Sequence, residues 1–513
     1  MRVGVGAVLD RALRERPEAQ ALVARSGTLT YAGLDAAADR AAAALWSLGV
    51  RPGDRIAASL PNDLDVVVAF HGAMRIGAIW VGIGEALAPP EKLALIGDCA
   101  PVVLFAPPDS CRELVDAGLD AGCRAVAVGA AEGEWQTALD TAELPPDVDI
   151  DVHAPAGIAY TSGTTGRPKG IVHSQHNLLL PGAVLVATRG WGPDLRKGDC
   201  LPLTILNLLV LTTLLTAQAT GCCVIMDRRD AGGIAEWIAR EQVTVWNGVP
   251  AQLHDLSSEG RIERTALASL REVWSGGGDL PEVVRARFAD TYGLTIRSTY
   301  GLTEAPTVVS IDPVGALRHD RASGQVLPHL CVQPCDANGA ALPPGEAGEL
   351  VISARQDGPW AGQWTPYLGV WRDGDVVDPP HATVVTGDIG TVDADGWVRI
   401  LDRRKVLVVR GGANVYPAEV ERVLMAVPGV AGAVVFGVPD PRLGERVAAL
   451  VEPAGSAALS AEGLRRACRA ELSAYKVPEQ WGIVRALPRN AMGKVIRTGL
   501  TDLLPPGEAD PAS

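Results

Sequence analysis

The chain has 513 residues, more than one hydrophobic core usually supports, so we expect more than one domain. With 47% hydrophobic and 21% charged residues, the composition excludes wholesale disorder. Acidic residues outnumber basic ones by 60 to 46, a net charge of −14, which argues against a nucleic-acid partner. Only six of the basic residues are lysines, so positions that keep lysine are candidates for sites that need a compact ammonium group.

Three features predict a cytoplasmic protein. The opening stretch, MRVGVGAVLDRALRERPE, carries charges where a signal peptide has an apolar core. The nine cysteines are irregularly spaced, as in large proteins with reduced thiols. Residues 200–226 hold no charged side chain, but they include Pro202, Asn207 and Gly221. We therefore predict a buried helix followed by a buried strand there, and no membrane span.

Short β-rich runs alternate with helical patterns along most of the chain, which is typical of α/β units with largely parallel strands. Between about residues 328 and 401 the pattern changes to strands separated by turns, which predicts small antiparallel β structure. The predicted elements, in chain order, are strand 222–226, strand 243–249, helix 251–256, strand 271–274, helix 281–292, helix 417–427, strand 430–438 and helix 459–472.

The predicted fold class is α/β. A large N-terminal domain of α/β subdomains and a small β-rich subdomain precedes a small α+β C-terminal domain. No Gly/Ser-rich linker separates them, so we expect a tight hinge rather than a tether. The predicted division is an N-terminal domain at 1–402, a hinge at 403–406, a C-terminal lid domain at 407–504 and a disordered tail at 505–513.

The sharpest motif is a loop between two β-like segments, Tyr160-Thr-Ser-Gly-Thr-Thr-Gly-Arg-Pro-Lys-Gly170. Glycines permit close backbone approach, while hydroxyls and one lysine supply the donors and the cation of a polyphosphate cradle. It is not the common P-loop, because Gly170 rather than Ser or Thr follows the lysine. The alternative is a solvated turn. The predicted nucleotide-binding residues of this loop are Thr161, Ser162, Gly163, Thr164, Thr165, Gly166 and Lys169.

With this loop and several other motifs, the chain resembles the adenylate-forming superfamily of acyl-CoA synthetases, peptide-synthetase adenylation domains and luciferases. The resemblance covers nearly the whole chain and lies in the order and spacing of many motifs. These are Leu29-Thr-Tyr31, Gly53-Asp-Arg55, the loop above, Ser275-Gly-Gly277, Tyr300-Gly-Leu-Thr-Glu304, Thr386-Gly-Asp388, Asp402-Arg-Arg-Lys405, Gly411-Gly412 and Pro488…Gly493-Lys494.

The motif residues have chemistry that suits ATP. Thr303 could donate to the α-phosphate, and Glu304 could hold Mg²⁺, which takes few carboxylates plus phosphate oxygens. Asp388 could accept hydrogen bonds from ribose hydroxyls, with Arg403 as a second contact. The nucleotide-facing aromatic and glycines are Tyr300, Gly301, Gly276 and Gly277. Taken singly, each residue also fits an ordinary role in a strand end, a turn or the surface.

The resemblance implies a two-step reaction with ATP, Mg²⁺ and coenzyme A. A carboxylate attacks the α-phosphorus, and a thiol then displaces AMP from the acyl-adenylate. Lys494 would stabilise the charge that develops in the first step. The C-terminal domain would rotate between the steps about Lys405, bringing Gly411 and Gly412 to a tunnel for the thiol.

The chain departs from the family around the acid. Many acyl-CoA ligases have Pro-x-Phe-His where this chain has Pro202-Leu-Thr204-Ile205. Val406 follows the hinge, and Trp364 and Trp371 replace a Gly-Tyr element. Since the segment 203–209 lacks an Asp to pair with an α-amino group, we predict a hydrophobic carboxylic acid. The candidate pocket residues are Ile205, Leu206, Leu209, Asn247, Val249 and Pro250, each of which could instead belong to the core.

Several alternatives stay open. The thiol could belong to a carrier protein, which would make the chain a stand-alone adenylation enzyme. The altered segment near the acid also fits a specialised enzyme that performs one half-reaction. A nucleotide-binding sensor is disfavoured because Lys494, Glu304 and Asp388 are all present. The sequence leaves open whether the chain forms a homodimer.

Overall fold

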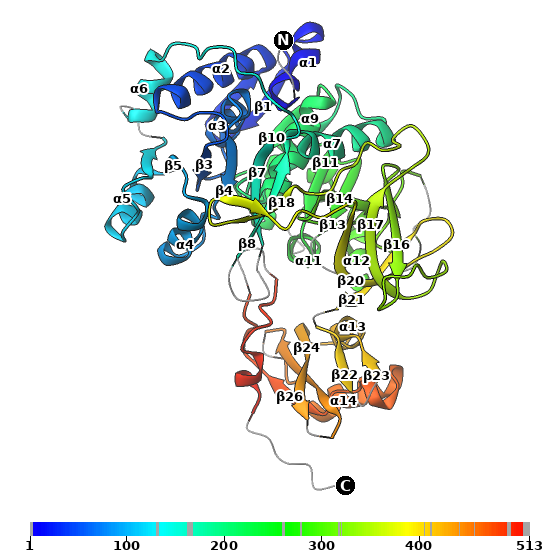
Figure 1. The fold of residues 1–513 in the computed structure, drawn as a ribbon. Helices are drawn as coiled ribbons and strands as arrows, with labels where there is room; N and C mark the ends of the chain where they lie inside the picture. Colours follow the sequence, from blue (N-terminus) through cyan, green and yellow to red (C-terminus); the bar gives the residue numbers. More distant parts are fainter. Residues whose placement is uncertain are drawn as a thin grey trace.

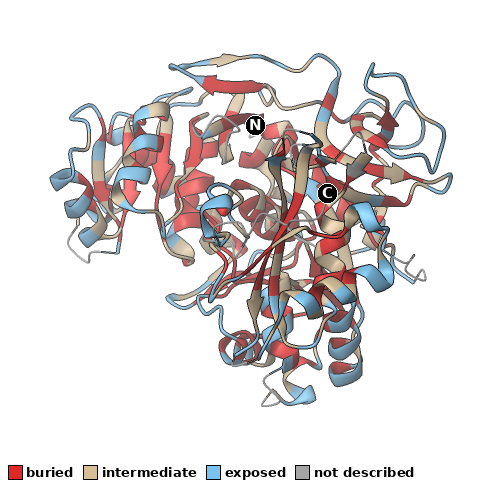
Figure 2. Ribbon diagram, turned by 90° about the horizontal axis from the view of Figure 1, so that it is seen from below, coloured by how far each residue is buried: buried red, intermediate tan, exposed pale blue. Residues whose placement is uncertain are grey.

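A computed structural model places four β-sheets and their covering helices (Figure 1). The residues that it describes are 4–129, 133–161, 168–258, 262–276, 280–315, 319, 321–404, 406–410, 413–440, 442–455, 457–489 and 494–505. Strands are largely buried, whereas the outer faces of the helices meet solvent (Figure 2).

The nine-stranded sheet has a parallel centre, and its outer pairs β1–β2, β13–β14 and β14–β15 are antiparallel. Its order is β15 (Gln325–Val326), β14 (Ala305–Ile311), β13 (Ile296–Leu302), β12 (Glu272–Ser275), β11 (Val245–Gly248), β9 (Arg196–Asp199), β10 (Cys222–Ile225), β1 (Gln20–Ala24) and β2 (Gly27–Thr30). The predicted alternation of strands with helices is confirmed here by α10 (Ala231–Glu241), α11 (Pro250–Ser258) and α12 (Glu282–Tyr292).

The eight-stranded sheet combines a parallel half with an antiparallel edge. Its order is β19 (Asp375–Val377), β18 (Gly369–Arg372), β8 (Lys169–Ser174), β7 (Pro155–Thr161), β4 (Ile79–Gly82), β3 (Arg55–Ala58), β5 (Val103–Ala106) and β6 (Arg124–Ala127). The helices of this part of the chain are α1 (Asp10–Glu15), α2 (Tyr31–Ser47), α3 (Leu64–Arg75), α4 (Pro89–Cys99), α5 (Pro108–Asp116), α6 (Glu134–Thr141) and α7 (Gln175–Arg189).

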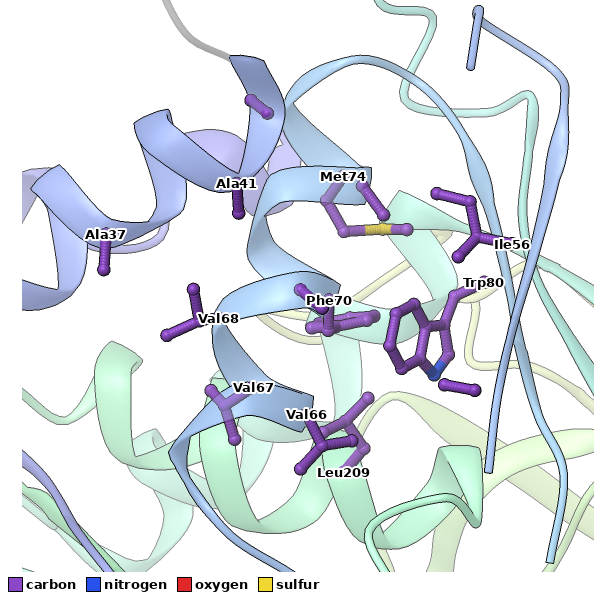
Figure 3. Close-up of a cluster of buried hydrophobic side chains, with 14 of the residues drawn as sticks. Ala37, Ala41, Ile56, Val66, Val67, Val68, Phe70, Met74, Trp80 and Leu209 are labelled. Atoms are coloured by element: carbon purple, nitrogen blue, oxygen red, sulfur yellow. The ribbon is translucent and has the colours of Figure 1, made fainter. Parts of the chain in front are cut away.

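One hydrophobic core joins the two large sheets. Its members come from α2 and α3, from strands of both sheets, and from the uncharged segment that follows β9. In Figure 3, Phe70 and Met74 of α3 lie beside Trp80 of β4, with Leu209 at the lower edge of the cluster. The uncharged segment forms α8 (Leu206–Leu209), a π-helix (Val210–Leu214), α9 (Leu215–Gln218) and then β10, as predicted. Among the described residues, no helix combines the length and apolar character that crossing a membrane requires.

Residues 330–403 form mostly the predicted antiparallel β structure, a four-stranded sheet of β16 (Leu330–Cys335), β17 (Gly348–Ala354), β20 (Thr383–Val392) and β21 (Val398–Arg403). The hairpin β18–β19 is the exception, because it leaves this sheet and pairs with β8 of the large sheet. Trp371 there lies opposite Gly170, and its indole N–H donates to the Asp98 carbonyl at 3.0 Å.

The C-terminal part has a sheet and a core of its own (Figure 1, orange to red). Ser460 accepts a hydrogen bond from the Gly463 N–H and so caps the second helix, as predicted. Helix α13 ends at Met425 rather than Val427. The elements of the C-terminal part are β22 (Val408–Arg410), β23 (Ala413–Val415), α13 (Pro417–Met425), β24 (Val430–Asp440), β25 (Gly444–Pro453), α14 (Ala461–Glu471) and β26 (Gln480–Ile483). The predicted tail falls outside the described residues beyond Pro505.

The core predicts a large cost for removing Trp80, which is 0% exposed and meets the Phe70 ring edge-on at 5.6 Å. Trp80→Ala should destabilise the N-terminal part by about 3–5 kcal/mol through lost burial and an unfilled cavity. Urea unfolding measures the change. Leu144→Ala, at a position 70% exposed, is the control and should change stability by less than ~0.5 kcal/mol. Equal effects of the two substitutions would contradict the packing described.

Candidate active site

Three predicted nucleotide residues meet at one carboxylate. Asp388 on β20 is only 4% exposed. The Tyr300 hydroxyl on β13 donates to its Oδ2 at 2.7 Å, and Arg403 on β21 places Nε 3.2 Å from its Oδ1. Burial, and then the charge of Asp388, raise the pKa of Tyr300, so this hydroxyl keeps its proton. Arg403 is mostly exposed and leaves part of its guanidinium facing solvent.

The backbone around Asp388 is fixed by its own motif. The Asp388 N–H donates to Thr386 Oγ1 at 3.1 Å, and that hydroxyl donates to the Leu350 carbonyl at 2.8 Å. Gly387 has φ of +74°, a left-handed conformation that favours glycine. The Thr-Gly-Asp motif therefore aims a carboxylate rather than forming an ordinary β-turn.

The Thr303–Glu304 turn joins β13 to β14 and is held from the large sheet. His173 Nε2 on β8 lies 2.8 Å from the Thr303 carbonyl oxygen, so this nitrogen carries the ring proton and donates it. His173 is completely buried, and burial lowers its pKa to about 4. A neutral histidine thereby connects the strand after the phosphate loop to the turn that carries the predicted metal ligand.

Tyr367 lies beside Lys169, the lysine at the end of the phosphate loop. The Lys169 ammonium is 5.7 Å from the centre of its ring. Burial, and then the charge of Glu304, raise the pKa of Tyr367. Tyr367 is therefore close to Lys169 and feels the charge of Glu304, the residues predicted to meet phosphate and Mg²⁺. Within the described residues, no group of three or more His, Cys, Asp or Glu could hold a metal by itself.

Gly276 follows β12 where the Thr299 side chain of β13 comes very close. A Cβ at this position would lie 2.3 Å from Thr299 Oγ1, which donates to the Ser275 carbonyl at 3.1 Å. A side chain here would force the Thr299 hydroxyl to move and break its hydrogen bond to Ser275. The glycine thus suits the close packing at the predicted adenine loop.

Lys494 brings the C-terminal part of the chain to the same group. Crowding by protein atoms and the charge of Arg403 lower the pKa of Lys494, and the charge of Asp388 raises it. Lys494 is exposed, and both of these charges act on its ammonium group. The ammonium lies within electrostatic reach of the Asp388 cluster.

The candidate acyl residues divide between core and sheet edge. Leu206 and Leu209 are buried in the core that joins the two sheets, 2% and 0% exposed (Figure 3). Ile205 lies half-buried just before α8. Asn247, Val249 and Pro250 are half-buried at the carboxyl end of β11.

Several predicted residues fall outside the described part of the chain. They are Ser162, Gly163, Thr164, Thr165 and Gly166 of the phosphate loop, Gly277 of the adenine loop, Lys405 of the hinge, and Gly411 and Gly412 of the tunnel. The strands flanking the phosphate loop are described, and they pair Thr161 with Lys169.

His173 and Tyr367 were absent from the sequence-based site. His173 had a local signal, a histidine in an otherwise apolar strand four residues after Lys169. Tyr367 had none, because it reaches Lys169 through the unpredicted pairing of β18 with β8.

The comparisons with known proteins agree with this geometry. Residues 9–357 match the AMP-binding enzyme family, and residues 419–494 match the AMP-binding enzyme C-terminal domain. The fold and the site define an adenylate-forming enzyme, and the chain belongs to the AMP-binding enzyme family.

Individual relatives span nearly the whole chain. Feruloyl-CoA synthase of an Amycolatopsis species is 32% identical over 96% of this chain and 98% of that protein. The fatty acid–[acyl-carrier-protein] ligase ScoC of Streptomyces coeruleorubidus is 31% identical over 95% of this chain and 94% of its own. ATP-bound MatB from Rhodopseudomonas palustris superposes with a TM-score of 0.86 at 29% identity, covering 96% of this chain and 97% of that one.

The buried histidine predicts a dependence of stability on pH. The pKa of His173 is about 4 in the folded chain against an ordinary 6.5, so between these values only the unfolded chain binds the proton. Its contribution to stability is complete above the ordinary pKa and is lost as the pH falls toward the folded one. His173→Gln keeps a donor for Thr303 but cannot titrate, so urea midpoints should fall less steeply with acidification than in the parent.

The matched control is His254→Gln, because His254 is exposed. It should keep the parent's slope of urea midpoint against pH. Parallel slopes for the parent and His173→Gln would contradict the buried, neutral state of His173.

Proposed function

We propose that this enzyme is an AMP-forming acid–thiol ligase that activates a hydrophobic carboxylic acid and transfers it to coenzyme A. The observation that carries the proposal is the meeting of Tyr300 and Arg403 at Asp388, with Lys494 in electrostatic reach, in a chain of the AMP-binding family. Asp388 could accept hydrogen bonds from the ribose, and Lys494 of the C-terminal domain supplies a cation nearby. This arrangement suits a reaction at the α-phosphate.

In the first step, an oxygen of the acid attacks the α-phosphorus of ATP, and the bond to the bridging oxygen of pyrophosphate breaks. Both reactants are anions, so the main task is to place them together and neutralise charge. Lys169 and Lys494 supply cations, and Thr303 supplies a donor. Mg²⁺, when bound, would neutralise phosphate charge; Glu304 fits it because Mg²⁺ takes one or two carboxylates with phosphate oxygens.

In the second step, the sulfur of the thiol attacks the acyl carbon, and the bond to AMP breaks. We propose that the C-terminal domain rotates for this step about the boundary at 402–407. Lys405 would be the hinge, and Gly411 and Gly412 would lie beside the incoming thiol. Rotation would move Lys494 away from the acyl group after the substrate carboxylate has lost its charge by forming the acyl-adenylate. The hydrogen bond from the Ala418 N–H to Asp402, at 2.8 Å, joins the two sides of the hinge in the state seen here.

The acid is proposed to be hydrophobic because the candidate pocket residues are mostly aliphatic: Ile205, Leu206, Leu209 and Val249. We place the enzyme in the cytoplasm, where ATP and coenzyme A are available. Measuring its molecular mass in solution would show whether it forms a homodimer. A carrier-protein thiol is the second candidate acceptor, since ScoC, 31% identical, is named for that acceptor.

The acceptor and the acid can be found together. Purified enzyme with ATP, Mg²⁺, coenzyme A and a panel of apolar acids should release AMP and form acyl-CoA with at least one acid, detected by mass spectrometry. Replacing coenzyme A with a phosphopantetheinylated carrier should give slower transfer. Faster loading of the carrier would favour the second candidate, and binding of acids without AMP or thioester would refute both.

Lys494 predicts a split between the two steps. Lys494→Ala should slow acyl-adenylate formation by at least about 100-fold, because a transition-state cation is lost. Thioester formation from supplied acyl-adenylate should change by only a few fold. Arg469→Ala, on an exposed position of α14, is the control and should change neither step. Equal losses in both steps would refute the assignment of Lys494.

A further inference from the structure

Lys197 and Asp199 form a buried ion pair on β9, in the middle of the nine-stranded sheet. Both side chains are 0% exposed, and the Lys197 ammonium lies 3.7 Å from Asp199 Oδ2. A buried charge is costly unless it is paired and hydrogen-bonded. In a chain with only six lysines among 46 basic residues, a lysine retained at the core of a sheet calls for a chemical reason.

The two partners are satisfied very unequally. Asp199 accepts hydrogen bonds from the Leu201 N–H at 2.9 Å and the Thr212 hydroxyl at 3.1 Å, and the Asn247 side chain also bonds to it. The Lys197 ammonium has no hydrogen-bond partner among the described residues. The centroid of the Trp274 ring lies 5.6 Å from the ammonium, and Cys223 on the neighbouring strand β10 pairs with Lys197 in the sheet. Among the described residues, the donor hydrogens of Lys197 are therefore left without an acceptor in hydrogen-bond range.

Neighbouring charges on the same sheet do not share this deficit. Arg189 Nε donates to Glu272 Oε2 at 2.9 Å, and the Trp274 indole N–H donates to the same oxygen at 3.0 Å. The buried Arg189 side chain, at the end of α7, is thus hydrogen-bonded to Glu272 of β12, whereas the Lys197 ammonium has no hydrogen-bond partner among the described residues.

The pair lies beside a residue that we propose for the acyl pocket. Lys197 is two residues before the carboxyl end of β9, about 7 Å deeper in the sheet, and its long side chain points back toward that end at Asp199. Asn247, which bonds Asp199, is one of the candidate acyl residues at the end of β11. Thr212, which also bonds Asp199, lies in the π-helix Val210–Leu214, a rare element that often marks functional sites.

We propose that Lys197 and Asp199 form the polar end of the acyl pocket and select hydrophobic acids that carry a neutral oxygen group, a hydroxyl or a carbonyl, remote from the reacting carboxylate. A hydroxyl of the acid can accept a hydrogen bond from the Lys197 ammonium and donate one to the Asp199 carboxylate, so that both members of the pair gain a hydrogen bond. A second carboxylate is disfavoured because Asp199 already supplies the negative charge. This inference rests on the proposed function, whose acid it describes more closely.

The test compares matched acids: octanoate with a set of hydroxyoctanoates, and phenylpropanoate with hydroxyphenylpropanoate. In the parent enzyme, the best oxygenated acid of a set should exceed its apolar partner in kcat/KM by about 10- to 100-fold. The double variant Lys197→Met/Asp199→Asn removes the pair without leaving one charge buried alone, so it should fold. In this variant the preference should fall to about one.

Lys92→Met is the matched control, because Lys92 is also a buried lysine, 4% exposed, but lies on α4 in the other sheet's layer. It should keep the parent's preference. A preference for apolar acids in every parent set, or one that the double variant leaves unchanged, would overturn the assignment.

Calorimetric binding of the same acids without ATP separates this inference from the proposed function. Tighter binding of an oxygenated acid, lost in the double variant, supports the pair even if no acid is turned over. Turnover with equal binding of both members of every set overturns the pair while leaving the ligase activity in place.

Discussion

The site depends on one buried carboxylate. Asp388 is almost inaccessible to solvent, and an isolated charge there would be unstable, so it must be paired. Its partners come from β13 and β21, which belong to different sheets, and Lys494 adds the charge of the C-terminal part. Asp388 therefore joins β20 and β21 of one sheet to β13 of another and also acts on the charge of Lys494.

The remaining site residues follow the same logic of bringing strands of different sheets to one place. His173 ties the strand after the phosphate loop to the Thr303 turn, and Tyr367 lies beside Lys169 and feels the charge of Glu304. The shared core beneath them is apolar and contains residues of both large sheets, which packs the two sheets together. Attack of an acid on the α-phosphorus of ATP needs no protein nucleophile. Such a reaction depends on positioning the two reactants and neutralising their charge more than on a reactive side chain.

Much of this could be predicted from the sequence, because the nucleotide residues lie in short motifs with chemical meaning. The α/β alternation, the antiparallel region and the helix capped by Ser460 were also legible from local periodicity and capping. The β18–β8 pairing and the histidine contact to Thr303 were not, since both join residues far apart in the chain. Lys197 showed only as a lysine without a role, because burial is a property of the folded sheet. The roles assigned to all of the site residues stay predictions, and Ser162–Gly166, Gly277, Lys405 and Gly411–Gly412 also lie outside the described residues.

The account's central claim is that a substrate carboxylate attacks the α-phosphorus of ATP. The most direct measurement is the fate of oxygen from an acid labelled with ¹⁸O in its carboxylate, followed by mass spectrometry of the products after thioester formation. Attack at the α-phosphorus predicts that AMP carries one labelled oxygen and that pyrophosphate carries none. Label in inorganic phosphate with release of ADP, or unlabelled AMP, would contradict it.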